Sequence, residues 1–101
     1  MELVLHMRDI PLLAGAAGYA AAGHTPGGTQ RNADHVAPFV RFADHITDID
    51  RLLLCDPQTS GGLLAAVAST AVERAHEALA AAEVPSVVIG KVIDGRGIRV
   101  E

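Results

Sequence analysis

The segment from Leu52 to Val67 places the strongest constraint on the fold, because a polar, turn-forming stretch separates two apolar runs. Asp56 precedes a proline, which biases its backbone away from a helix and toward a turn. Gly61 and Gly62 allow positive φ angles, or a close approach that a side chain would block. The chain is therefore expected to turn here and to continue as a second apolar element.

Two interpretations of this turn remain open. The commoner outcome for a glycine-rich segment is a plain turn that feeds a buried strand. Alternatively, the backbone N–H groups of the glycines hold a phosphate or another anion, together with the hydroxyls of Thr59 and Ser60.

The composition allows one modest core that is almost free of aromatic side chains. A length of 101 residues sets an expectation of a single domain spanning 1–101. Half of the residues are hydrophobic but only 3% are aromatic, so the core must be built from Ala, Leu, Val and Ile. The net charge of −4 argues against a nucleic-acid partner, which would favour a basic surface.

The sequence predicts a cytoplasmic protein with no membrane partner. No apolar run reaches the roughly 18 residues of a membrane span, and Met1-Glu2 lacks the basic start of a signal peptide. The single cysteine, Cys55, rules out an internal disulfide and agrees with a reducing compartment.

Hydrophobic periodicity predicts the elements of the first half. Residues 2–8 alternate, with Leu3, Leu5 and Met7 on the face expected to be buried, which indicates a strand. Asp9 is the expected N-cap of a helix that runs to about residue 22 and stops at Gly23. Residues 24–38 show no regular period and are expected to form a long loop.

The second half predicts a short strand at 39–42, a helix capped by Thr47 or Asp48 that reaches residue 53 or 54, and a buried strand at 62–67. Thr70 and Glu73 form a capping-box pattern that opens a further helix. A Val/Ile-rich strand at 86–93 completes a β-α-β unit, and residues 94–97 favour a hairpin return to 98–100. The expected fold class is therefore α/β (α+β), a mixed sheet with helices packed on it.

A metal site is not expected. The histidines and the cysteine show no metal-ligand spacing; these residues are His6, His24, His35, His45, His76 and Cys55. The acidic run at 44–50 lacks the glycine and terminal glutamate of a calcium-binding EF-hand. Gly27 and Gly28 offer bare amides in a second polar segment, where Arg31 is the obvious partner for a phosphate or carboxylate.

Two long motifs resemble the selenophosphate synthetase (selenide, water dikinase) family. The sequence D-P-Q-T-S-G-G-L-L at Asp56–Leu64 is similar to the family's C-terminal signature, and P-G-G-T-Q-R-N at Pro26–Asn32 is similar to its P-G-G-T-x-R-N segment. The ending, Val88–Val92 followed by Gly95 and Gly97, also fits. The resemblance covers nearly the whole chain.

The resemblance implies a partial AIR-synthase-related (PurM-like) C-terminal domain. The family uses ATP and Mg²⁺ to convert selenide into selenophosphate, AMP and phosphate. Its reactive Cys, Lys and Mg²⁺-binding Asp residues lie in segments that this sequence does not contain, so Cys55 is not that reactive residue. We therefore expect no catalytic residue here, no tight cofactor binding and no activity alone. The expected partners are the family's N-terminal ATP-binding domain and further copies of the same chain.

The candidate phosphate-proximal residues lie in the two glycine-containing segments. They are Thr25, Gly27, Gly28, Thr29, Arg31, Asn32, Asp56, Thr59, Ser60, Gly61 and Gly62. Asp56 is expected to brace its turn by accepting backbone N–H bonds. The alternative functions are a non-catalytic module that self-associates, or one that binds an anion or nucleotide through these segments.

Overall fold

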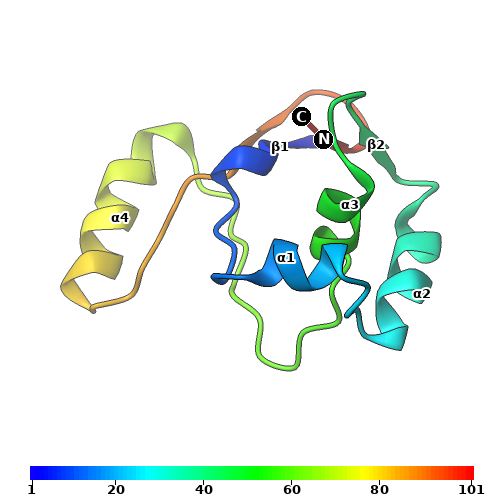
Figure 1. Ribbon diagram of the computed structural model, residues 1–101. Coiled ribbons are helices and arrows are strands. Elements are labelled where there is room, and N and C mark those ends of the chain that lie inside the picture. Colours follow the sequence, from blue (N-terminus) through cyan, green and yellow to red (C-terminus); the bar gives the residue numbers. More distant parts are fainter.

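The computed structural model describes all residues, 1–101, as a mixed sheet with four helices (Figure 1). The strands are β1 (Glu2–Leu5), β2 (Val40–Phe42), β3 (Gly90–Ile93) and β4 (Gly97–Val100). The helices are α1 (Ala16–Ala21), α2 (Gly27–Val36), α3 (Asp48–Leu54) and α4 (Val72–Ala81), with 3-10 turns at Met7–Asp9 and Ser69–Ala71. This α+β arrangement confirms the predicted fold class and fits part of a PurM-like domain.

The sheet has the strand order β2-β4-β1-β3, so the strand nearest the start of the sequence lies between the two strands nearest its end. β1 pairs antiparallel with β3 and parallel with β4, and β4 pairs parallel with β2. The predicted hairpin between residues 90–93 and 98–100 is therefore wrong. Both segments are strands, but β1 separates them and takes the hydrogen bonds that a hairpin would use.

The prediction of which face of β1 is buried is only half correct. Leu3 and Leu5 are half-buried, whereas Val4, on the opposite face, is fully buried at 0% exposure. Val4 shares its cross-strand row with Lys91 and Arg99. Aliphatic stems of long charged side chains can cover apolar surface while their charges stay in water. Alternation alone therefore did not reveal which face is more shielded.

A buried carboxylate fixes the β1 end of the sheet. Glu2 is 8% exposed, and its Oε1 lies 2.7 Å from Nη2 of Arg41 and 3.4 Å from Nε of Arg99. Gly95 (φ +150°) passes so close that a Cβ there would lie 2.6 Å from the Glu2 carboxylate. The turn between β3 and β4 can therefore cross the end of β1 only with glycine at this position.

The first helix is shorter than predicted. The β1 strand ends at Leu5, residues 7–9 form a 3-10 turn, and Asp9 bonds to the His6 ring at 3.2 Å instead of capping a helix. Ile10 precedes a proline and is extended, as such residues prefer, and this delays the helix. Helix α1 begins after Gly15, which has φ +85°, and Gly23 (φ +84°) follows its end as predicted.

The predicted long loop at 24–38 is wrong, because α2 occupies residues 27–36. Thr29, Ala33 and Val36 form its inward face, at the spacing of four and three that a helix requires. Only two of these three residues are apolar, and the remaining positions of α2 are glycines or polar residues, so the sequence shows no helical period of apolar residues. Gln30 and Asp34 add a side-chain hydrogen bond of 2.9 Å one turn apart.

Strand β2 and helix α3 confirm their predictions. Thr47 caps α3, because its hydroxyl accepts from the Asp50 N–H at 3.1 Å. The Asp50 carboxylate in turn accepts from the Thr47 N–H at 3.0 Å, which completes a capping box. α3 packs beside α1 and α2 (Figure 1), and this cluster positions the pockets described below.

Residues 59–88, which we call the arm, differ most from prediction. The segment 62–67 is not a strand, so the predicted β-α-β unit does not form, and β3 begins only at Gly90. The cause is the lack of a neighbouring strand, since an isolated extended segment cannot satisfy its backbone. α4 lies apart from the sheet (Figure 1) and its N-cap is Ala71, so the capping box predicted at Thr70 is absent.

Candidate functional site

The two polar segments singled out in the sequence meet where α2 begins and α3 ends. The Asn32 side chain donates to the Cys55 carbonyl oxygen at 2.9 Å, which ties α2 to the residue after α3. A Cβ on Gly28 would lie 3.0 Å from Cγ of Pro57. The glycine thus lets the first turn of α2 pack directly against the loop that follows Cys55. The structure thereby brings together residues 27–32 and 55–58.

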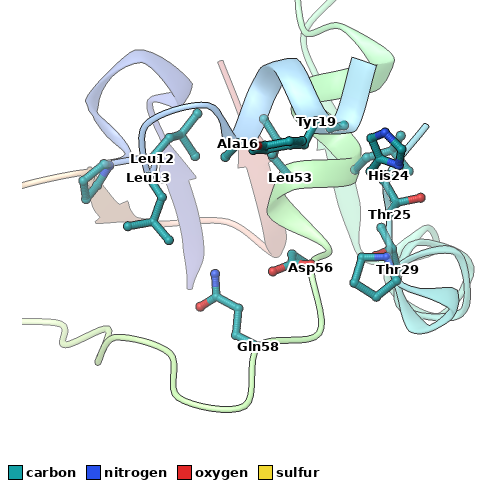
Figure 2. Close-up of a pocket in the computed structure, with 14 residues that line it drawn as sticks. Leu12, Leu13, Ala16, Tyr19, His24, Thr25, Thr29, Leu53, Asp56 and Gln58 are labelled. Carbon is teal, nitrogen blue, oxygen red and sulfur yellow. The ribbon is translucent and has the colours of Figure 1, made fainter. Parts of the chain in front are cut away.

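A pocket of about 240 Å³ opens beside this junction, between α1, α3 and the start of α2 (Figure 2). Its apolar wall comes from α1, α3 and the preceding loop, including Leu12, Tyr19 and Leu53. Figure 2 shows the side chains of Asp56 and Gln58 on the opposite side, turned toward the pocket. The pocket therefore combines an apolar wall with the carboxylate of Asp56, which is a hydrogen-bond acceptor, and the side-chain amide of Gln58.

Thr29 contributes a buried hydroxyl that lacks a partner. The residue is 2% exposed, lines the pocket, and its Oγ1 makes no hydrogen bond. An unsatisfied buried polar atom costs free energy and calls for a partner. The Thr29 hydroxyl is thus an unpaired polar group in the wall of the pocket.

The start of α2 adds electropositive character at the same place. Its N-cap, Pro26, supplies no side-chain hydrogen bond, so the first amides of the helix, at Gly27 and Gly28, are uncapped. Arg31 extends one of its guanidinium nitrogens back along the helix, to 3.7 Å from the position of a Gly28 Cβ. Bare amides, a helix dipole and a guanidinium together favour a negatively charged group.

A second pocket of about 290 Å³ lies between the sheet and helices α2 and α3. It is lined mostly by apolar side chains such as Leu5, Phe42 and Val100, with the Cys55 thiol beside them. Burial raises the pKa of this thiol because the thiolate is poorly solvated there. A thiol held neutral is a weak nucleophile, so the structure gives Cys55 a packing role.

The predicted site residues before residue 58 lie at the first pocket or in α2, whereas those after residue 58 do not. Thr25, Thr29 and Asp56 line the first pocket, Gly27, Gly28 and Arg31 form the start of α2, and Asn32 bridges to Cys55. The remaining four residues are exposed and line neither pocket; they are Thr59, Ser60, Gly61 and Gly62.

Two features of the site were not predicted correctly. Asp56 was expected to brace its turn, but its carboxylate accepts no backbone hydrogen bond and faces the pocket instead. Gln58 lies inside the D-P-Q-T-S-G-G-L-L motif but was not among the predicted site residues. Its side chain nevertheless lines the pocket. The apolar wall was missed because Leu12, Tyr19 and Leu53 are far apart in sequence and carry no shared motif.

No group of three or more His, Cys, Asp or Glu side chains is arranged to hold a metal ion. None of the helices combines the length and the apolar character needed to cross a membrane.

The fold is an α+β arrangement that fits part of a PurM-like domain, and it carries a pocket beside the start of α2. This chain is homologous to a segment of the selenide, water dikinases, also called selenophosphate synthetases. It is 38% identical to the selenide, water dikinase of Salmonella typhi over 102 aligned positions, covering 98% of this chain and 28% of that protein. It is 40% identical to that of Myxococcus xanthus, covering 91% of this chain and 26% of the relative.

A third relative, the selenide, water dikinase of Yersinia pseudotuberculosis, is 46% identical over 67 residues, which is 66% of this chain and 18% of that protein. The chain spans about a quarter of the length of the first relatives it matches. No protein-family model matches the sequence. The similarity is therefore to one part of these longer proteins.

Proposed function

We propose that this chain forms the C-terminal portion of a selenide, water dikinase, which transfers a phosphoryl group from ATP to selenide and releases selenophosphate, AMP and phosphate. The homology over 98% of the chain carries this proposal. The role of the chain in that enzyme is to present an anion-binding element to an active centre whose other parts come from the N-terminal ATP-binding domain.

The start of α2 supports this role. The uncapped amides of Gly27 and Gly28 and the guanidinium of Arg31 suit the oxygens of a phosphate group. The buried Thr29 hydroxyl adds a donor that has no partner within the chain. When bound, ATP supplies the transferable phosphoryl group. The residues of this chain orient and neutralise an anionic group, which is most of what phosphoryl transfer asks of a protein.

The residues present do not suit Mg²⁺. The chain has no cluster of carboxylates that could hold the ion, and Asp56 stands as the one acid in the pocket. We therefore assign the metal ligands and the reactive Cys and Lys to the N-terminal domain. On this assignment the isolated chain makes no selenophosphate and binds no cofactor tightly. We also propose that the complete enzyme resides in the cytoplasm.

A complementation experiment tests this function. A curated relative is produced without the segment that matches this chain, and the two polypeptides are combined with Mg-ATP and selenide under reducing, anaerobic conditions. Phosphorus NMR is expected to detect selenophosphate and AMP in the mixture and in neither polypeptide alone. Turnover by this chain alone, or no turnover by a mixture in which the two polypeptides bind each other, would contradict the proposal.

Arg31→Ala tests the anion-binding role within the same assay. Arg74→Ala is the matched control, because it removes the same charge from α4 in the arm. Loss of one charge-assisted contact to phosphate is expected to lower kcat/KM about tenfold or more. Arg74→Ala should leave it unchanged. Equal activities of the two variants would remove Arg31 from the site.

A further inference from the structure

Asn32 makes the only hydrogen bond between α2 and a part of the chain that is distant in sequence. Its Nδ2 donates to the Cys55 carbonyl oxygen at 2.9 Å, across 23 positions. All other hydrogen bonds of residues 27–36 stay within the helix or reach residues 26, 37 and 39 beside it. No ion pair links α2 to the rest of the chain either. The placement of α2 therefore depends on apolar packing and on this one bond.

The acceptor of this bond controls how the chain leaves α3. Cys55 is 8% exposed and follows the last residue of the helix, where backbone carbonyls lack helical partners. The same peptide unit donates through the Asp56 N–H to the Leu53 carbonyl oxygen at 3.4 Å. Because a peptide unit is planar, the two bonds together fix its orientation. Asn32 thereby sets the direction in which the chain enters residues 56–58.

Gly28 is a second contact point on the same face of α2. It lies one helical turn before Asn32, and a Cβ there would lie 3.0 Å from Cγ of Pro57. Arg31 extends a guanidinium nitrogen to 3.7 Å from the same Cβ position and forms no ion pair within the chain. The anion-binding groups at the start of α2 thus lie beside the place where the helix meets residues 55–57.

We propose that Asn32 is a positioning residue, which holds Gly28 and Arg31 in register with Asp56 without itself touching the anion. This role rests on the proposed function, because it concerns how the same anion-binding element is held in place. The sequence motif placed Asn32 among the phosphate-proximal residues. The bond to Cys55 gives its amide a task inside the protein instead.

Loss of the Asn32 amide leaves a buried carbonyl oxygen without its donor. Such a group shifts toward water or another partner, since an unpaired buried acceptor costs free energy. The shift moves Asp56 and Pro57 relative to the start of α2. Misplacement of a binding group by about 1 Å can lower a reaction rate about a hundredfold. Asn32 is therefore expected to affect turnover through Arg31.

Nuclear Overhauser effects between Gly28 Hα and the Pro57 ring protons test the tether in the isolated chain. The wild type is expected to show them and Asn32→Leu to lose them. Gln30→Leu is the matched control, because it removes a 2.9 Å hydrogen bond to Asp34 that stays within α2, and it should keep them. Persistence of these effects in Asn32→Leu would overturn the proposal, even if its activity fell.

The complementation assay with Mg-ATP and selenide tests the consequence for turnover. The chain is added to saturation, so that a smaller folded fraction does not lower the rate. Asn32→Leu is expected to lower kcat/KM at least about tenfold, and Gln30→Leu to leave it unchanged. Asn32→Gln retains the amide and should stay within about threefold of the wild type. Equal losses in the leucine and glutamine variants of Asn32 would contradict the role of the amide.

A double-mutant cycle with Arg31→Ala separates positioning from a general loss of stability. If Asn32 acts through Arg31, then Asn32→Leu should cost less than about threefold once Arg31 is already alanine. Independent contributions would instead multiply, and that result would overturn the proposal. Asn32→Ser, whose hydroxyl is too short to reach the carbonyl, replaces Asn32→Leu in every arm if circular dichroism shows the leucine variant to be unfolded.

The two proposals fail in different ways. Turnover by the wild-type mixture with multiplicative effects of Asn32 and Arg31 would remove the positioning role and keep the proposed function. A wild-type mixture that binds but does not turn over would remove the proposed function and with it the catalytic meaning of Asn32. The contact between Gly28 and Pro57 is still measured in that case, because its test needs no activity.

Discussion

The sheet and its helices differ from the arm although both are rich in apolar residues. We call residues 1–58 and 89–101 the body. In the body, Val4 and Val100 are almost fully buried, and Glu2 is held by two arginines. In the arm, Leu63 is fully exposed despite lying in the most continuous apolar run of the sequence. Apolar content thus sets what a segment can bury, and the presence of an opposing surface decides whether it does.

Gly90→Ala and Gly62→Ala give the largest expected contrast between body and arm. A Cβ on Gly90 would fall on the Val4 carbonyl oxygen and force β3 away from β1, whereas a Cβ on Gly62 meets nothing within 4 Å. Gly90→Ala is expected to lower the free energy of unfolding by about 2–3 kcal/mol or more. Urea unfolding measures both variants, and Gly62→Ala should stay within about 0.5 kcal/mol of the wild type. Equal losses would contradict the contrast.

Glu2→Gln compares a paired charge in the body with an unpaired charge in the arm. The substitution leaves the side-chain shape but removes the charge that faces Arg41 and Arg99. Arg41 is exposed and Arg99 is partly exposed, so solvent screening limits the loss to about 1–2 kcal/mol. Glu73→Gln on α4 is the control and is expected to change the stability by less than about 0.5 kcal/mol. Thermal unfolding at low protein concentration distinguishes the two, and a larger loss at Glu73 would refute the assignment.

Thr47→Ala and Thr70→Ala compare two threonines that occupy the same sequence pattern. Thr47 makes a capping box with Asp50, whereas Thr70 lies in a 3-10 turn and caps nothing. Thr47→Ala is therefore expected to cost about 1 kcal/mol, and Thr70→Ala close to none. Chemical denaturation checks this pair. A similar loss at Thr70 would mean that α4 is capped in solution as the sequence pattern predicted.

The smallest expected effect on stability comes from ionisation of the Cys55 thiol. Its pKa is raised by burial, so the folded state favours the neutral thiol. This contribution to stability is fully present below the unfolded-state pKa and is lost as pH rises through the higher folded-state pKa. Alkylation by iodoacetamide should be slower than in a denatured control and should accelerate at a higher pH than it does there. The same pH dependence in both states would contradict the burial of this thiol.

Local signals predicted part of the local structure, although the helix caps expected at Asp9 and Thr70 do not form. The capping residues at 47–50 define α3, and Gly23 follows α1, because both signals act within one helical turn. Helix α2 was missed because its inward face consists of Thr29, Ala33 and Val36, which is too small and polar a set to produce a clear period. Local patterns therefore predict elements when the local energy dominates.

The pairing of strands that are distant in the chain could not be predicted from the sequence. Nothing in residues 90–100 indicates that β1 separates β3 from β4, since that depends on a strand about 90 positions away. The candidate site shows the same division. Its glycines and Arg31 were visible as motifs, whereas the apolar wall assembles from α1 and α3 only in the folded chain.

The placement of β1 also constrains how the chain acquires its fold. Its residues 2–5 pair only with residues 90–93 and 97–100, so β1 precedes both of its partners by almost the whole length of the described chain. Contacts of such sequence separation slow folding, and β1 stays unpaired in a nascent chain until β3 and β4 have been made. On the ribosome, helices α2 and α3 can form before the sheet, which must wait for β3 and β4.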